Sequence, residues 1–212
     1  MPSGDAHAPE NSKQKPEITR SAQSAKNFET ELAEMIDARR DFPCIVAWVP
    51  FNEGWGQYQT AKITNWIKAY DPSRLVVPAS GWNDFPVGDV HDIHSYPGPH
   101  APPANPVRAA VLGEFGGLGL PVPGHLWTDK ENWGYRRYKN ADELTAAYVN
   151  LATKLQPLVA SHLSAAVYTQ TTDVETEVNG LMTYDREQIK MDANKVRAAN
   201  ATLFKALADR KP

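Results

Sequence analysis

Residues 44–57 read CIVAWVPFNEGWGQ. Eight uncharged residues, Cys44 to Phe51, end abruptly in an amide, a carboxylate and an indole, which belong to Asn52, Glu53 and Trp55. An apolar run without polar alternation is typical of a strand that is buried on both faces. We therefore expect a buried parallel strand here, with Cys44 in the core and polar side chains at the carboxyl end.

Helical and extended segments alternate along the rest of the chain. Apolar residues recur at helical spacing in four segments, 25–40, 57–70, 142–159 and 193–208. Short apolar runs predict five strands, at 45–49, 74–80, 89–96, 109–117 and 164–170. Strands that alternate with helices pair in parallel through right-handed crossovers. The sequence therefore predicts an α/β fold.

Side chains able to do chemistry follow the predicted strands at their carboxyl ends. They are Glu53, Trp82, His94, Tyr96, Glu114, Tyr168 and Gln170. In a parallel (β/α) barrel, the active site lies at this end of the strands. Such side chains at the end of one strand would mean little, but at the ends of five successive strands they indicate one shared pocket.

Glu53 and Glu114 are two carboxylates on separate predicted strands. A pair of carboxylates that flanks a bond is the minimal equipment for glycoside hydrolysis. One of them must stay protonated near neutral pH, and a neighbouring carboxylate raises its pKa by like-charge repulsion. Asn52 could bind a sugar hydroxyl, and flat apolar faces for the sugar are offered by Trp55, Trp82, Trp127 and Tyr168.

Three motifs together resemble glycoside hydrolase family 2, the β-galactosidases and β-glucuronidases. WVPFNEGWGQ (48–57) resembles the fourth-strand motif of that family, and VLGEFGG (111–117) resembles its seventh-strand motif. YTQTTDVETEVNGLMTYDR (168–186) is similar to the eighth-strand ending and the loop after it. The resemblance covers Ala25 to about Lys190. It implies a retaining mechanism with Glu114 as nucleophile, Glu53 as acid/base and Tyr96 hydrogen-bonded to the nucleophile.

The resemblance also implies the fold. The five predicted strands would be the fourth to eighth of a (β/α)8 TIM barrel, over residues 25–212, after an irregular lead-in over residues 1–24. A whole barrel takes about 250 residues, and members of the family carry β-sandwich domains before it. We therefore expect a fragment of a longer enzyme, with Met1 an internal methionine or the gene truncated.

Two alternatives to an active enzyme stay open. The chain is either a catalytically inactive remnant that binds sugar weakly or not at all, or a subunit whose barrel a partner chain completes. Unpaired sheet edges would also favour self-association.

Composition excludes several other classes of protein. The net charge is −3 without a basic cluster, so we expect no nucleic-acid partner. No apolar run approaches the roughly 20 residues of a membrane span, and the polar N-terminus lacks the apolar core of a signal peptide. A leader of a secreted or periplasmic parent would lie in the missing part, so the compartment stays open.

We expect neither a cofactor nor a metal. No strand is followed by a glycine-rich phosphate-binding fingerprint, which argues against a dinucleotide. His91 and His94 have a spacing that suggests metal ligands, but on a strand this spacing puts them on opposite faces. His94 is better interpreted as a residue that contacts the sugar.

Overall fold

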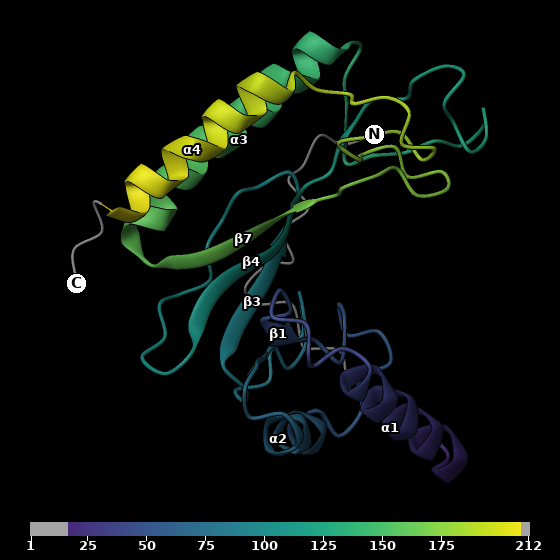
Figure 1. The fold of residues 1–212 in the computed structure, drawn as a ribbon, viewed down its shortest axis with the longest axis vertical. Helices are drawn as coiled ribbons and strands as arrows, with labels where there is room; N and C mark the ends of the chain where they lie inside the picture. Colours follow the sequence, from purple (N-terminus) through teal and green to yellow (C-terminus); the bar gives the residue numbers. More distant parts are fainter. Residues whose placement is uncertain (1–16, 209–212) are drawn as a thin grey trace. The chain divides into compact units, whose positions relative to one another are not determined.

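The structure is a computed structural model that describes residues 17–208. Its described residues divide into two units, which we describe separately (Figure 1). Unit 1 comprises residues 94–102 and 112–208, and unit 2 comprises residues 17–93 and 103–111. Most of the predicted lead-in, residues 1–16, lies outside the described residues. The predicted extent of the catalytic domain, residues 25–212, stays a prediction.

Unit 2 contains helices α1 (Ala22–Asp37) and α2 (Thr60–Tyr70), which confirm the first two predicted helices. Helix α1 begins after Ser21, whose hydroxyl accepts the N–H of Ser24 at 3.2 Å. The core of the unit is formed by fully buried aliphatic side chains together with Trp48, namely Ile36, Ile63, Ile67, Val76 and Trp48. The indole N–H of Trp48 donates to Asp71 at 2.9 Å, so this buried polar group is satisfied.

The first two strands are much shorter than predicted. Strand β1 covers Ala47–Trp48 and β2 covers Leu75–Val76, and they pair in parallel with Ala47 opposite Leu75. Each strand is followed two residues later by a proline, Pro50 or Pro78. Proline has no N–H to donate to a ladder, so the pairing is interrupted there. It resumes in the same register at a parallel bridge between Asn52 and Ser80.

Asp89 separates β2 from the next strand, β3 (Val90–Ser95). Its Oδ2 accepts the N–H of Val76 at 2.8 Å, and its own N–H donates to the carbonyl of Val76 at 2.9 Å. Lys68 lies 2.5 Å from Oδ1 of the same carboxylate. Val76 is therefore joined to the segment before β3 by one backbone hydrogen bond and one bond to a side chain, where a regular ladder would use two backbone bonds.

Cys44 is exposed, so the expected core position is wrong. The segment after α1 is a series of turns, and β1 begins only at Ala47. Arg74 holds this segment by donating to the carbonyls of Ile45 at 2.7 Å and Arg40 at 2.6 Å. The thiol therefore lies before the buried part of the apolar run.

Three strands form the main sheet, in the order β3, β4 (Ala109–Gly116) and β7 (Leu163–Thr169). The division into units falls within β3 and β4, and β7 belongs wholly to unit 1. A separate parallel pair is formed by β5 (Leu118–Gly119) and β6 (Arg136–Arg137), which the sequence did not predict. Strands β3, β4 and β7 confirm three of the five predicted strands.

Unit 1 also contains the two remaining predicted helices, α3 (Ala141–Ser161) and α4 (Ala193–Ala208). They run side by side (Figure 1). The hydroxyl of Tyr148 donates to Asn200 at 3.0 Å, which ties the two helices together. Helix α3 begins after Asn140, whose side chain accepts the N–H of Glu143 at 2.9 Å.

The prediction of a partial (β/α)8 TIM barrel is wrong. The described strands form one sheet of three strands and two pairs, instead of five adjoining strands. The prolines after β1 and β2 and the carboxylate of Asp89 interrupt the ladder that a barrel would need. The local βα pattern was predicted correctly, but the continuity of the sheet was not.

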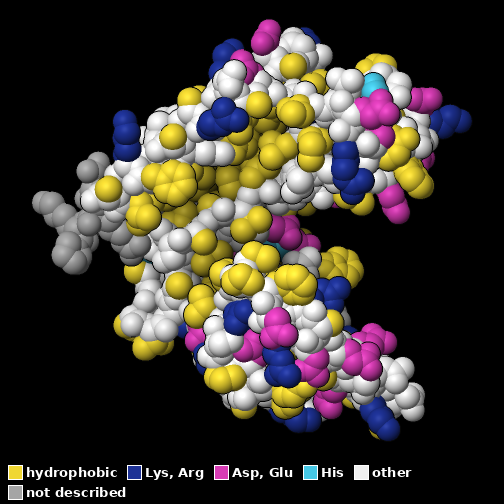
Figure 2. Space-filling view, viewed as in Figure 1, with side chains coloured by type: hydrophobic (Ala, Val, Ile, Leu, Met, Phe, Trp, Pro, Cys, Tyr) yellow, Lys and Arg dark blue, Asp and Glu magenta, His cyan; other side chains and the backbone are white. Residues whose placement is uncertain are grey.

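Strand β7 is an edge strand of the main sheet, and its residues 164–167 are exposed. Beside it lies a groove of about 390 Å³ that is lined by apolar side chains of β7, α3 and α4, including Leu155, Ala166 and Phe204. Figure 2 shows hydrophobic side chains gathered next to these two helices. Self-association through sheet edges, or completion by a partner chain, stays a prediction.

Candidate active site

The predicted nucleophile, Glu114, lies near the carboxyl end of β4 in unit 1. Its side chain is 29% exposed, so it is partly buried yet accessible. Two residues later, Gly116 has a φ of 96°, and a Cβ at this position would lie only 2.3 Å from Cε2 of Tyr168. Glycine is required here because any side chain would collide with that ring. This close approach fixes the path of the strand just beyond Glu114.

Tyr96 follows β3 directly and contacts Glu114. Its hydroxyl donates to Oε2 of Glu114 and lies 2.9 Å from Oγ1 of Thr169, at the end of β7. A phenol has one proton, and an ionised carboxylate can only accept. The phenol proton therefore goes to Glu114, and the hydroxyl of Thr169 donates to the phenol oxygen. The ends of three strands thus supply one chain of hydrogen bonds that leads to the carboxylate.

The phenol of Tyr96 is only 3% exposed. Burial, followed by the hydrogen bond to Glu114, raises the pKa of Tyr96 far above its ordinary value of 10. The phenol is therefore neutral throughout the physiological pH range. It acts as a permanent hydrogen-bond donor beside Glu114.

His94 places a second polar group next to the same carboxylate. Its Nδ1 lies 3.4 Å from Oε2 of Glu114, and its side chain is fully buried. The structure thus brings together three of the predicted site residues, His94, Tyr96 and Glu114.

Tyr168 has a different environment from the one that its predicted role needs. Its ring packs edge-on against Phe115 at 5.6 Å and against Tyr148 of α3 at 4.9 Å between ring centroids. It also lines the apolar groove beside α3 and α4. Burial raises the pKa of Tyr168 well above its ordinary value. In unit 1 this ring is part of the packing between the sheet and the helices, and a contact with sugar stays a prediction.

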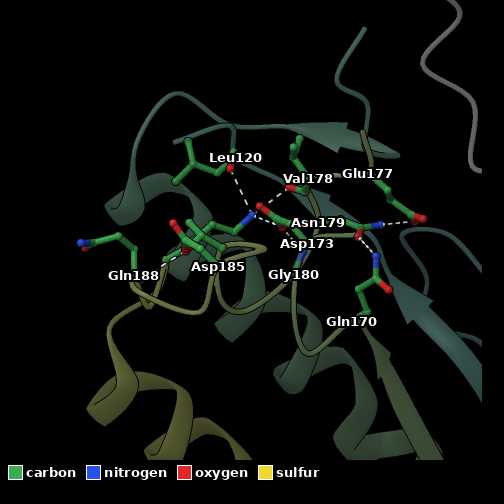
Figure 3. A network of polar contacts seen from close by, with 11 residues as sticks. Leu120, Gln170, Asp173, Glu177, Val178, Asn179, Gly180, Asp185 and Gln188 are labelled. Atoms are coloured by element: carbon green, nitrogen blue, oxygen red, sulfur yellow. Dashed lines mark hydrogen bonds and ion pairs between the residues drawn. The ribbon is translucent and has the colours of Figure 1, made fainter. Parts of the chain in front are cut away.

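Gln170 belongs to a network of polar contacts in the loop after β7 (Figure 3). Its amide donates to Oδ1 of Asn179 at 2.8 Å, and the amide of Asn179 donates to Glu177 at 2.8 Å. The backbone of Gln170 also bonds to this loop, through the carbonyl of Asn179 and the N–H of Leu181. Gln170 therefore anchors the loop, and its predicted role in binding substrate stays untested.

The same network contains a buried ion pair. The ammonium of Lys190 lies 2.6 Å from Oδ1 of Asp173, and it also donates to the carbonyls of Leu120 at 3.1 Å and Val178 at 2.9 Å. Burial lowers the pKa of Lys190 and raises the pKa of Asp173. One cation thus joins the loop after β7 to Leu120, the residue that follows β5.

Trp127 lies in the long segment between β5 and β6. It is 63% exposed, and its ring meets that of Tyr184 edge-on at 5.7 Å. Nearby in sequence, His125 pairs with Asp185 at 2.8 Å. His125, Asp185 and Glu187 offer metal-ligand atoms within 4.8 Å of one another, but the first two already satisfy each other by a hydrogen bond.

The remaining predicted residues lie in unit 2, in and near the turn after β1. Glu53 has a φ of 49°, in the left-handed region that residues other than glycine rarely adopt. The turn is closed by the N–H of Trp55, which donates to the carbonyl of Asn52 at 2.7 Å, while Glu53 donates to the carbonyl of Ser80 at 2.6 Å. Trp55 is 66% exposed and Trp82 is 37% exposed, so both indoles are accessible. Strained backbone of this kind is concentrated at functional sites.

The sequence analysis missed Thr169 and Tyr135. Successive residues of a strand face opposite sides, so a ring at Tyr168 that faces α3 places Thr169 on the side of Glu114. That pattern could have identified Thr169. Tyr135, whose ring stacks on Tyr96, comes from a segment without hydrophobic periodicity, and no sequence signal indicates it.

Neither the models of known protein families nor the curated protein sequences match this chain. The resemblance to glycoside hydrolases therefore depends on the quoted motifs. Within residues 17–208, no helix has both the length and the apolar character that a bilayer crossing requires.

Proposed function

We propose that this chain is a retaining glycoside hydrolase of the β-galactosidase or β-glucuronidase type, with Glu114 as its nucleophile. The contact between Tyr96 and Glu114 supports this proposal most directly. A neutral phenol that donates to Oε2 holds the carboxylate in place and leaves Oε1 to attack the sugar. Thr169 supports the phenol from behind at 2.9 Å.

The proposed reaction has two steps. Glu114 attacks the anomeric carbon while the glycosidic C–O bond breaks, and the departing oxygen takes a proton from Glu53. Glu53, now ionised, then removes a proton from water, which attacks the anomeric carbon and releases Glu114. One glycosidic bond and one water molecule are consumed, and the configuration at the anomeric carbon is retained.

The other predicted residues would bind the sugar. Asn52 would hydrogen-bond a ring hydroxyl, and the accessible indoles of Trp55, Trp82 and Trp127 would stack on C–H faces of the substrate. Buried His94 would help to position the nucleophile, because its Nδ1 lies 3.4 Å from Oε2 of Glu114.

A covalent trap tests this proposal without the need for turnover. The chain of residues 1–212 is incubated with 2,4-dinitrophenyl 2-deoxy-2-fluoro-β-galactoside or the corresponding glucuronide, which form stable glycosyl esters with retaining enzymes. Mass spectrometry should find one added sugar on the peptide that contains Glu114. The variant Glu114→Gln should not be labelled. The variant Glu131→Gln, which changes an exposed carboxylate, should be labelled like the unmodified chain. A label on another residue, or none with either reagent, would contradict the proposal.

A further inference from the structure

Tyr135 lies flat on the ring of Tyr96. The two ring centroids are 3.7 Å apart, and the ring planes differ by 1°. Tyr96 is buried, whereas Tyr135 is 40% exposed. Tyr135 therefore covers one face of the phenol that contacts Glu114. It comes from the segment before β6 and not from a strand of the main sheet.

Gly117 makes this close stacking sterically feasible. It has a φ of 61°, and a Cβ there would lie 2.3 Å from Cδ2 of Tyr135 and 3.0 Å from Cδ1 of Tyr96. The carbonyl of Gly117 also accepts the N–H of Tyr135 at 3.0 Å. The glycine thus leaves space for both rings and holds the backbone of one of them.

Tyr135 is itself held in place. The ring of Trp133 meets it edge-on at 5.5 Å between centroids. The carbonyl of Trp133 accepts the N–H of Val178 at 2.8 Å, and its N–H donates to the carbonyl of Thr176 at 2.9 Å. The loop after β7 therefore anchors the segment that carries Tyr135.

The stack restrains a motion of Tyr96 to which its hydrogen bonds add little resistance. Bonds at the hydroxyl limit movement along the ring axis, but a displacement perpendicular to the ring plane is opposed chiefly by packing on the ring faces. Such a displacement would carry the hydroxyl away from Oε2 of Glu114. The face covered by Tyr135 lies in the direction of this motion.

We propose that Tyr135 is a positioning residue, which keeps the hydroxyl of Tyr96 against the nucleophile. This inference rests on the proposed function. Tyr135 acts only through Tyr96. Fixing Tyr96 in place should speed mainly the second step of the reaction. In that step Glu114 leaves as a carboxylate, and a fixed donor stabilises the charge that develops on it.

Three variants separate stacking from general packing. Tyr135→Phe keeps the ring, Tyr135→Leu removes it, and Tyr70→Leu removes one ring of a comparable stacked pair in unit 2, where Trp66 and Tyr70 lie 4.8 Å apart. Loss of one donor to a developing charge costs about 10²–10³ in kcat, so a loosened donor should cost about tenfold. With a 2,4-dinitrophenyl glycoside, Tyr135→Leu should lower kcat and KM together, because the glycosyl-enzyme accumulates.

The expected results for the other variants are different. Tyr135→Phe and Tyr70→Leu should keep kcat and KM within about twofold of the unmodified chain, well under the tenfold effect of a loosened donor. If Tyr135→Phe loses as much as Tyr135→Leu, the hydroxyl of Tyr135 matters and the stack does not. If Tyr135→Leu lowers kcat without lowering KM, its effect is not confined to the second step. Either result would overturn the inference.

A measurement that needs no activity separates this inference from the proposed function. In a chain with ¹³C-labelled glutamate carboxyl groups, the NMR signals of Glu114, assigned with Glu114→Gln, should move in Tyr135→Leu because the hydrogen bond from Tyr96 is loosened, and should stay unchanged in Tyr70→Leu. A covalent label on Glu114 without any movement of these signals would overturn the inference alone. Absence of the label in the unmodified chain would overturn the proposed function and, with it, the catalytic role of Tyr135.

Discussion

The ammonium of Lys190 and the carboxylate of Asp173 lie 2.6 Å apart with neither side chain more than 2% exposed. Such a pair gains Coulomb energy in a medium of low dielectric constant but loses the hydration of both ions. Here the two carbonyls of Leu120 and Val178 complete the shell around the ammonium. The pair therefore holds the loop after β7 in one conformation.

Lys190→Met should lower the free energy of unfolding by about 3–5 kcal/mol, because it leaves Asp173 buried without a counter-ion. Urea denaturation followed by tryptophan fluorescence measures this change. Lys195→Met is the matched control, since Lys195 is 61% exposed and lies 3.9 Å from Asp192. The control should change stability by less than about 1 kcal/mol, and equal losses in both variants would refute the role given to the buried pair.

Gly116→Ala should destabilise the fold by about 2–5 kcal/mol, because it combines left-handed backbone with a collision against Tyr168. Gly124→Ala separates these two costs. Gly124 also has a positive φ, of 85°, but a Cβ there would meet nothing within 4 Å. It should therefore lose only the backbone contribution of about 1–2 kcal/mol. Thermal and urea unfolding of both variants would show whether the steric contribution exists.

Acid should weaken the contact between Asp185 and its partners. The hydroxyl of Thr183, followed by His125, holds the pKa of Asp185 at about 2, below its ordinary value of 3.8. The folded state therefore binds this proton less tightly than the unfolded chain. The stabilisation is complete above about pH 4 and is lost as the pH falls towards about 2.

Asp185→Asn should remove this pH dependence. Between about pH 4 and pH 2 the unmodified chain should lose more stability than the variant, because only the unmodified chain has the depressed pKa. Asp129→Asn, at an exposed position of the neighbouring loop, should behave like the unmodified chain. Urea denaturation at several pH values measures the difference, and parallel curves for Asp185→Asn and the unmodified chain would contradict this account.

Glu53→Gln should discriminate between leaving groups if Glu53 is the acid. Alkyl glycosides need protonation of the departing oxygen, so their hydrolysis should fall by about 10²–10⁴. The rate at which a 2,4-dinitrophenyl glycoside forms the glycosyl-enzyme should change little. The burst of released dinitrophenol measures this rate. Glu131→Gln serves as a control for loss of a surface carboxylate. An equal loss on both substrate types would argue against Glu53 as the acid.

Local features of this chain could be predicted from its sequence, and longer-range ones could not. Helices α1 and α3 follow from their periodicity, although they begin at Ala22 and Ala141, slightly before the predicted segments. The ends of β1 and β2 depend on prolines that are visible in the sequence. The replacement of one backbone ladder bond by a bond to the side chain of Asp89 depends on three-dimensional placement, which no period reveals.

The candidate site shows the same division. The contact between Tyr96 and Glu114 was implied by the resemblance to glycoside hydrolase family 2, and the structure contains it. The sequence analysis named Tyr168 and not the next residue, Thr169, although it is Thr169 that bonds to Tyr96. Tyr135 could not be found, because its role arises from a contact between a loop and the sheet.

Two consecutive glycines, at the last position of β4 and the position after it, also limit the order in which mutations can accumulate in this part of the chain. Gly116 lies against Tyr168, and Gly117 lies against Tyr135. A larger residue at either glycine is tolerable only after the facing tyrosine has been replaced by something smaller. Yet loss of the second tyrosine uncovers the phenol beside Glu114. A lineage that replaces Gly117 must therefore pass through sequences in which the phenol beside Glu114 is uncovered, so descendants that keep the carboxylate in use should retain Gly117 together with Tyr135.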